Sequence, residues 1–540
     1  MNKRYKTTLL IASVFAIFTA CNQKYELDVN DISNNSDKNI TKISKEQKTE
    51  QNTTKQIIKP TQDIVVVKKP IKTKTELVVE TKEIKPTKIE TKTINNIDPK
   101  PTKIVQKDYY PTKVLKRTSS IATKETISKF DFDIIKKGFK SDNTLLIVGG
   151  IQGDEPGGFM AASLIATHYK ITKGSVWIIP NLNFYSIIKR SRGPYGDMNR
   201  KFANLSVNDP EYETVQRIKG YIKKDDIKLI VNLHDGSGFY RPTFEDKNHS
   251  QYKWGQCSII DQDKINAKKY SNLKQISDQI VKHVNQNALD KEHIYHTHNT
   301  RTSEGDKEME KTLTYYAIKN GKAAFGNEAS KSLPTHQRIY YHLLALEKYM
   351  QVMGIEYERK FNLNDQVIKN IIDNDIEIAL YDNKIKLPLA QIRNILRYFP
   401  VKKDGTIDFV PSNPLMSIVK ERNEYTIYYG NRRLSKLKAD FVEHSKDQKD
   451  IKLLVDDKIQ NVKFGDTIKV KKDILLYPID KYRINVIGYT NKTKIETDVK
   501  ISLKKMLKRF SIDKQGLTYR AEFYTNKKFV GMILIEFMDK

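Results

Sequence analysis

Three short apolar runs, each close to glycine, limit what this chain can fold into. They cover residues 145–148, 229–233 and 323–325, and polar residues follow each of them within a few positions. Runs of this length are typical of strands buried inside a sheet. Helical periodicity lies between and after them, over residues 156–169 and 334–353. The pattern predicts an α/β domain, with a mixed sheet and flanking helices, whose strand ends meet at one crevice.

The polar residues at these strand ends form a candidate metal site. Gln152 and Glu155 lie three residues apart on a loop, His234 ends the second run, and Glu328 ends the third. An amide oxygen, a carboxylate and an imidazole can hold zinc as in a hydrolase, with the fourth position open. A further carboxylate, Glu328, can then act as the general base toward water. Each residue alone has an ordinary structural role, and their joint order favours the site.

Two arginines between the first two strands provide candidate cations. A hydrolase of this kind needs fixed positive charge for an oxyanion and for a substrate carboxylate, preferably from side chains with two donors. Arg192 follows Ser191 and precedes Gly193, and Arg200 follows Asn199. Several other basic residues lie close to Arg192 in sequence, and any of them could supply the cation at the oxyanion instead.

The order Gln152-x-x-Glu155, Asn199-Arg200, His234, Glu328 resembles the site of zinc carboxypeptidases of the carboxypeptidase A type. More narrowly, it is similar to the D,L-carboxypeptidases that trim peptidoglycan in helically shaped bacteria, which carry glutamine where the superfamily has its first histidine. The resemblance covers residues from about 118 to 540. It implies removal of the terminal meso-diaminopimelate from an uncrosslinked muramyl tripeptide, which leaves a dipeptide and contributes to helical cell shape.

The resemblance also implies a role for each residue of the site. One Zn²⁺ per chain is expected on Gln152, Glu155 and His234. The remaining assignments are Glu328 as the catalytic base, Arg192 at the oxyanion, and Asn199 with Arg200 at the substrate's terminal carboxylate. Glutamine is a neutral and weaker ligand than imidazole, so we expect lower metal affinity than for a site whose first ligand is histidine.

Two other functions remain open at this level. The same scaffold could deacylate a small N-acyl amino acid, although an exported protein with added β domains is not needed for that. It could also be a catalytically inactive cell-wall-binding protein, for which the weak ligand Gln152 is the sole support. Metal content and the identity of the released product would separate these possibilities.

The charge of the chain excludes few classes of binding partner. With 95 basic and 65 acidic residues, its formal net charge is +30. Such an excess permits binding to nucleic acid, to an anionic membrane or to an anionic polymer. The lysines are spread along the chain without a basic helix or an RNA-binding signature, so we predict a diffusely charged surface and no nucleic-acid partner.

The first residues predict export. Residues 1–6 are cationic, residues 7–20 are largely apolar and too short to span a bilayer comfortably, and Cys21 follows. This resembles a bacterial lipoprotein signal, in which Cys21 is lipidated and becomes the mature N-terminus. Phe18 is unusual in that motif, so a cleaved signal or an uncleaved anchor remain alternatives. We expect a periplasmic protein, anchored to a membrane by lipid.

The rest of the chain divides into four predicted regions. Residues 22–117 lack glycine, are rich in Lys, Thr and Pro, and predict a disordered linker. Residues 118–358 form the predicted catalytic domain. Short strands with polar turns predict a barrel-like β domain over 359–445 and an immunoglobulin-like sandwich over 446–540. These two β domains are where we expect cell-shape protein partners to bind.

Other reactive side chains receive structural interpretations. With Cys21 acylated, Cys257 has no partner and is expected to be a small buried apolar residue. His293, His296 and His298 lie in the polar stretch 292–301, which predicts a loop with surface histidines.

Overall fold

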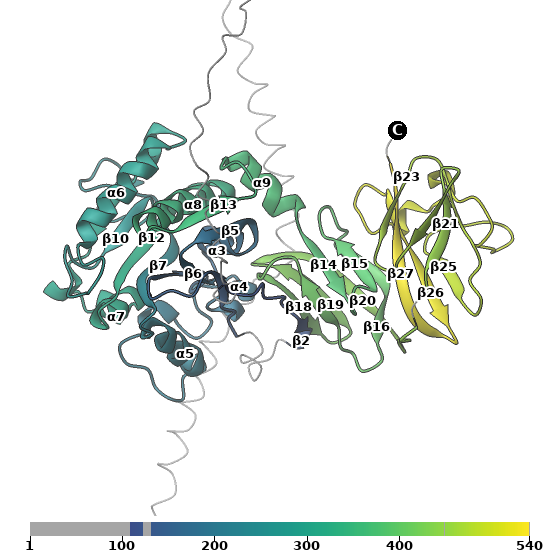
Figure 1. Cartoon of the computed structure of the whole chain (residues 1–540), viewed down its shortest axis with the longest axis horizontal. Coiled ribbons are helices and arrows are strands. Elements are labelled where there is room, and N and C mark those ends of the chain that lie inside the picture. Colours follow the sequence, from purple (N-terminus) through teal and green to yellow (C-terminus); the bar gives the residue numbers. More distant parts are fainter. Residues whose placement is uncertain (1–108, 122–130, 448, 539–540) are drawn as a thin grey trace, which may run out of the picture. The chain divides into compact units, whose positions relative to one another are not determined.

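The protein is described by a computed structural model over residues 109–121, 131–447 and 449–538 (Figure 1). A seven-stranded sheet forms its first domain. The strands are β3 Ile135–Gly138, β4 Thr144–Val148, β6 Ser175–Ile179, β7 Ile227–Gly236, β10 Cys257–Ile260, β11 His296–Asn299 and β12 Ala323–Ser330. Their order is β11-β10-β12-β7-β4-β6-β3. The four central strands are parallel, whereas β3 and β10 are antiparallel to β6 and β12, so the predicted mixed sheet is confirmed.

Helices cover both faces of this sheet. They are α3 Pro156–His168, α4 Phe184–Lys189, α5 Tyr212–Ile222, α6 Leu273–Gln286, α7 Leu313–Lys319 and α8 Thr335–Val352. Because side chains alternate along a strand, β4 contributes to two cores. Leu145 and Ile147 pack with α3, α6 and α8, whereas Leu146 and Val148 pack with α5 and α7. All four are buried, which explains why residues 145–148 are all apolar.

The three apolar runs of the sequence are the neighbouring strands β4, β7 and β12, as predicted. Since the strands are parallel, their carboxyl ends lie at one edge of the sheet. Glu328 on β12 is directly beside His234 on β7 in the register of the two strands. Pro156 is the first residue of α3 and Glu155 is its N-cap. The sheet therefore brings the predicted site residues to one edge.

Short pairs complete the first domain. They are β5 Tyr169–Lys173 with β13 Glu356–Arg359, and β8 Phe239–Tyr240 with β9 His249–Ser250. The prediction of a loop with surface histidines was wrong, because His296 and His298 lie on β11 and are half-buried. The His298 ring stacks on Tyr240, with centroids 4.0 Å apart. Cys257 is a free, fully buried thiol, as predicted.

A middle region follows helix α9, Asp365–Asn374. It contains a four-stranded sheet, β1-β17-β14-β15, and a five-stranded sheet, β16-β20-β19-β18-β2. The strands are β1 Arg117–Thr118, β2 Ser120–Ile121, β14 Glu377–Leu380, β15 Ile385–Pro388, β16 Ile395–Lys402, β17 Asp408–Pro411, β18 Met416–Glu421, β19 Glu424–Tyr429 and β20 Arg432–Val442. Its buried residues, such as Phe399 and Ile418, belong to the same core cluster as Leu145. The middle region thus shares a hydrophobic core with the first domain.

The C-terminal domain has two further sheets, with the strand orders β22-β21-β24 and β23-β27-β26-β25. The strands are β21 Ile451–Val455, β22 Lys458–Val462, β23 Thr467–Val470, β24 Ile474–Leu476, β25 Arg483–Val486, β26 Thr518–Thr525 and β27 Lys528–Phe537. Buried residues of both sheets, among them Leu453 and Phe523, form a core cluster of their own. A separate β domain at the C-terminal end was predicted and is confirmed.

Several predictions concern residues outside the described ranges. They are the signal at 1–21 with its lipidation site Cys21, and most of the linker at 22–117. The predicted disorder does not extend over the last residues of that linker, because Tyr109 forms a bridge with Phe139 and Arg117 in β1 pairs with Phe409 in β17. Among the described helices, none has both the length and the apolar character needed to cross a membrane.

Candidate active site

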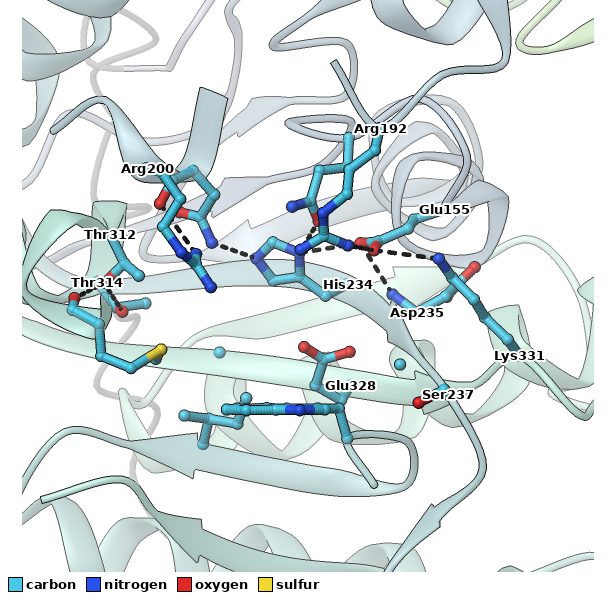
Figure 2. Close-up of a pocket in the computed structure, with 17 residues that line it drawn as sticks. Glu155, Arg192, Arg200, His234, Asp235, Ser237, Thr312, Thr314, Glu328 and Lys331 are labelled. Atoms are coloured by element: carbon cyan, nitrogen blue, oxygen red, sulfur yellow. Dashed lines mark hydrogen bonds and ion pairs between the residues drawn. The ribbon is translucent and has the colours of Figure 1, made fainter. Parts of the chain in front are cut away.

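One cavity at the carboxyl edge of the sheet collects every residue that the sequence assigned to the site (Figure 2). Its volume is about 260 Å³. The predicted residues that line it are Gln152, Glu155, Arg192, Asn199, Arg200, His234 and Glu328. They come from three strand ends and one loop, so the topology of the sheet produces the cluster.

Three candidate metal ligands converge on one point. Nδ1 of His234 lies 3.0 Å from Oε1 of Gln152 and 2.9 Å from Oε2 of Glu155. Ligand atoms around a tetrahedral zinc ion lie about 3.4 Å apart, because each bond is about 2.1 Å long. A small outward movement of these three side chains would therefore accommodate the ion. The donor set of an amide oxygen, a carboxylate and an imidazole suits a divalent metal.

Among the described residues, no group of three or more His, Cys, Asp or Glu side chains is arranged to hold a metal ion. The candidate site has only Glu155 and His234 of these types at the point of convergence, and its third donor is the amide of Gln152.

Asp197 fixes the orientation of the Gln152 amide. Its Oδ1 accepts a hydrogen bond from Nε2 of Gln152 at 2.8 Å, which turns the amide oxygen toward His234. Asp197 is held in turn at the start of a short 3₁₀ helix, Met198–Arg200, where it accepts from the backbone N–H of Asn199 at 2.9 Å. The second carboxylate oxygen accepts from Nε of Arg192 at 3.1 Å.

Asp235 fixes the loop that carries Glu155. Its Oδ2 accepts from the backbone N–H of Gly157 in the first turn of α3 at 2.7 Å, and Arg338 lies 3.2 Å from the same oxygen. Its Oδ1 lies 3.1 Å from Nε2 of the buried His342. Burial works to raise the pKa of Asp235, but these partners prevail and hold it below its usual range. An ionised carboxylate therefore anchors the start of α3.

Glu328 is a buried carboxylate without a fixed partner. Its Oε2 has no hydrogen-bond partner among the described residues. Figure 2 shows the carboxylate pointing across the cavity toward His234. Desolvation raises the pKa of Glu328 to about 8, while the charge of His234 opposes the rise and that of Glu155 adds to it. A carboxyl group with a pKa near neutrality can both take and return a proton.

The environment of His234 is set by its acidic neighbours. Burial works to lower the pKa of His234, but the hydrogen bond and negative charge of Glu155, with the charge of Glu328, raise it overall. The imidazole is 6% exposed, so these partners act with little screening by water.

Cations surround the cluster on separate sides. NH1 of Arg192 and Nζ of Lys331 each lie 3.4 Å from Oε1 of Glu155. Arg200 lies on the opposite side of His234 from Lys331 (Figure 2). The Arg200 guanidinium donates to the backbone oxygen of Asn199 at 3.2 Å and lies 3.6 Å from Oε2 of Glu308. Arg192 and Arg200 are thus both positioned to meet negative charge inside the cavity.

Three charged residues of the site were not predicted from the sequence, namely Asp197, Asp235 and Lys331. Asp197 lies two residues before Asn199, and Asp235 directly follows His234. Lys331 lies three residues after Glu328. Proximity to a candidate residue was the available signal, but the contacts that define their roles join distant segments.

Comparisons with known proteins identify the family of this chain. A family model described as "Carboxypeptidase controlling helical cell shape catalytic" matches residues 115–373. A second, described as "C-terminal domain of metallo-carboxypeptidase", matches residues 444–538. A comparison with curated protein sequences gave no match.

Solved structures of the cell shape determinant protein Csd4 from Helicobacter pylori are similar to this chain. The apo form is 37% identical, with 79% of this chain and 100% of that chain covered and a TM-score of 0.68. The tripeptide-bound form is 38% identical, with 79% of this chain and 100% of that chain covered and a TM-score of 0.67. The mDAP-bound form, described as a D,L-carboxypeptidase, is 39% identical, with 78% of this chain and 100% of that chain covered and a TM-score of 0.68. The chain therefore belongs to the family of carboxypeptidases that control helical cell shape.

Proposed function

We propose that this protein is a zinc-dependent D,L-carboxypeptidase that trims peptidoglycan stem peptides and contributes to helical cell shape. It releases meso-diaminopimelate from the muramyl tripeptide by cleaving its bond to D-glutamate, and a dipeptide remains. The observation that carries the proposal is that Gln152 Oε1 and Glu155 Oε2 lie 3.0 Å and 2.9 Å from His234 Nδ1, with Glu328 lining the same cavity. The tripeptide-bound and mDAP-bound structures of Csd4 support this substrate class.

Gln152, Glu155 and His234 would hold the zinc ion. When bound, the ion acidifies water and polarises the scissile carbonyl. Glu328 takes the proton of the attacking water on its free Oε2, which no other group occupies among the described residues. The same carboxyl group then returns the proton to the leaving amine of diaminopimelate. Burial of the Glu328 carboxyl group favours its protonated form, and the charge of a bound metal ion would favour the carboxylate that accepts the proton.

The remaining charged residues orient the substrate. Asn199 and Arg200 bind the terminal carboxylate, for which a guanidinium offers two donors in one plane. Arg192 is half-exposed at the cavity and stabilises the negative charge that develops on the scissile carbonyl oxygen. Met309, Thr312 and Thr314 also line the cavity in which the released residue would lie.

The proposal extends to the location and the accessory regions. Cys21 is the lipidation site of a periplasmic, membrane-anchored lipoprotein, and the Lys-, Thr- and Pro-rich residues that follow it link the anchor to the catalytic domain. The β regions 359–445 and 446–540 have barrel-like and immunoglobulin-like arrangements and bind cell-shape protein partners. Sheets with short strands in both regions support this proposal.

Digestion of purified muramyl tripeptide tests the function. We expect the zinc-loaded protein to release diaminopimelate, and a chelator to abolish the release. Glu328→Gln should retain zinc and lose turnover by about a thousandfold or more, since it removes the proton acceptor. Zinc-loaded protein that releases no diaminopimelate would contradict the proposal, and release of acyl groups from small N-acyl amino acids instead would favour a deacylase.

A further inference from the structure

Asn232 carries a buried oxygen atom without a partner beside the candidate metal site. The residue lies on β7, two positions before His234 and therefore on the same face of the strand. Its side chain is fully buried. Nδ2 of Asn232 lies 2.7 Å from Nε2 of His234, while its Oδ1 has no hydrogen-bond partner among the described residues. Buried polar atoms are rarely left unpaired, so this oxygen requires an explanation.

The chemistry of the imidazole provides one. A neutral imidazole that offers Nδ1 to a metal carries its hydrogen on Nε2. That N–H needs an acceptor, and the amide NH₂ of Asn232 cannot accept. Rotation of the amide by 180° exchanges its nitrogen and oxygen, which have nearly the same size and are assigned from hydrogen bonding alone. Oδ1 would then accept from Nε2, and the unpaired oxygen would be paired.

The second amide near this nitrogen cannot take that role. Nδ2 of Asn199 lies 3.4 Å from Nε2 of His234. Oδ1 of Asn199 accepts from the backbone N–H of Leu313 at 3.1 Å, and a backbone N–H can only donate. The orientation of the Asn199 amide is therefore fixed, with its NH₂ group toward the imidazole. Asn232 is the neighbour of Nε2 that is free to present an oxygen.

We propose that Asn232 is a positioning residue for the metal ligand His234. Its side-chain carbonyl accepts the Nε2 hydrogen and thereby holds the imidazole in the tautomer that offers Nδ1 to the ion shared with Gln152 and Glu155. Metal-binding histidines commonly donate their second N–H in this way, and loss of the acceptor typically lowers metal affinity about 10- to 100-fold. The inference rests on the proposed zinc site and adds a residue that acts through a ligand without touching the ion.

Zinc affinity of the full chain tests the proposal, by competition with a chromophoric chelator. Asn232→Leu keeps the volume but removes the acceptor, and we expect zinc binding about 10- to 100-fold weaker than in the wild type. Asn232→Asp keeps an acceptor and should restore most of the affinity. Asn181→Leu is the matched control, because Asn181 is also fully buried but bonds to Asp133 outside the cavity and should leave zinc affinity unchanged.

The outcomes separate this inference from the proposed function. Wild-type protein that fails to bind zinc would overturn both. Wild-type protein that binds zinc, with Asn232→Leu equally tight, would overturn the inference alone. If Asn232→Leu fails to fold, ¹⁵N-histidine NMR of the zinc-loaded wild type decides: a hydrogen on Nε2 of His234 is expected, and a hydrogen on Nδ1 would overturn the proposal.

Discussion

Burial at Glu328 links the chemistry of the site to the stability of the fold. Desolvation raises its pKa from 4.5 to about 8. The folded state therefore binds this proton more tightly than the unfolded state does. Stability contributed by the protonated group is fully present below about pH 4.5 and is lost as the pH rises toward 8. The ionised form, which the proposed mechanism requires as the proton acceptor, thus destabilises the metal-free fold.

Glu328→Gln should remove this dependence. In protein kept free of metal by a chelator, we expect the free energy of unfolding of the variant to exceed that of the wild type increasingly from about pH 5 to 8, by up to about 1.4 kcal/mol per pH unit. Urea unfolding at several pH values measures the difference. The exposed Glu377→Gln is the control and should leave the pH dependence unchanged. A gap for Glu328→Gln that does not vary with pH would argue against this effect of burial.

Asp197 decides whether Gln152 presents its oxygen or its nitrogen to the ion. Asp197→Ala removes the acceptor for Nε2 of Gln152, so the amide can turn freely. We expect zinc affinity to fall about 10- to 100-fold, as for other residues that orient ligands. Chelator competition measures this, with the exposed Asp142→Ala as control. Unchanged affinity in Asp197→Ala would mean that another group orients the amide.

At the scale of elements, the loop between β4 and α3 has no room for a side chain at Gly153. A Cβ atom there would lie 2.0 Å from the backbone oxygen of Ser186, which cannot move aside alone. Gly153→Ala should therefore displace the loop that carries Gln152 and Glu155. We expect it to lower the free energy of unfolding by about 1–3 kcal/mol and to weaken zinc binding.

Gly220→Ala is the matched control for that variant. Gly220 lies within α5, and a Cβ atom there would meet nothing within 4 Å. The change should stabilise the protein by about 0.5–1 kcal/mol, because alanine favours the helix. Thermal unfolding of both variants provides the comparison. Equal stability of Gly153→Ala and wild type would show that the loop is not constrained as the packing indicates.

Elements with a clear local pattern of residues could be predicted from the sequence. The strands β4, β7 and β12 each contain a short buried apolar run, and Pro156 marks the start of α3, so both were recognisable. The β11 strand was missed because its polar residues, such as His296, resemble a loop. Asp197 was missed because its role depends on Gln152, 45 residues away along the chain. Contacts of that kind leave no local pattern.

At the scale of the whole molecule, the hydrophobic cores do not follow the predicted series of three domains. The middle region shares a core with the first domain, and contacts join them: Asn413 donates to Ser163 at 3.3 Å, and Arg432 pairs with Asp373 at 2.7 Å. A second cluster lies within 451–537, while other buried residues of that region, Ile512, Tyr524, Phe529, Met532 and Leu534, belong to the shared cluster. The region after about residue 445 thus has a core of its own and a buried apolar contact with the shared core.

We therefore expect a fragment of residues 444–540 to fold alone. It should show a single cooperative transition in calorimetry, because it contains a core cluster formed by its own residues. A fragment of residues 109–373 should fail to do so, since it lacks the middle strands that complete its core. Cooperative unfolding of the shorter N-terminal fragment would contradict the shared core.

The location of bound zinc tests the central claim most directly. Anomalous diffraction at the zinc edge, from crystals of the zinc-loaded protein, should show one strong peak about 2.0–2.2 Å from Gln152 Oε1, Glu155 and His234 Nδ1. Glu328 should face that peak without bonding to it. A peak at any other group of side chains, or no peak in zinc-loaded protein, would contradict the account.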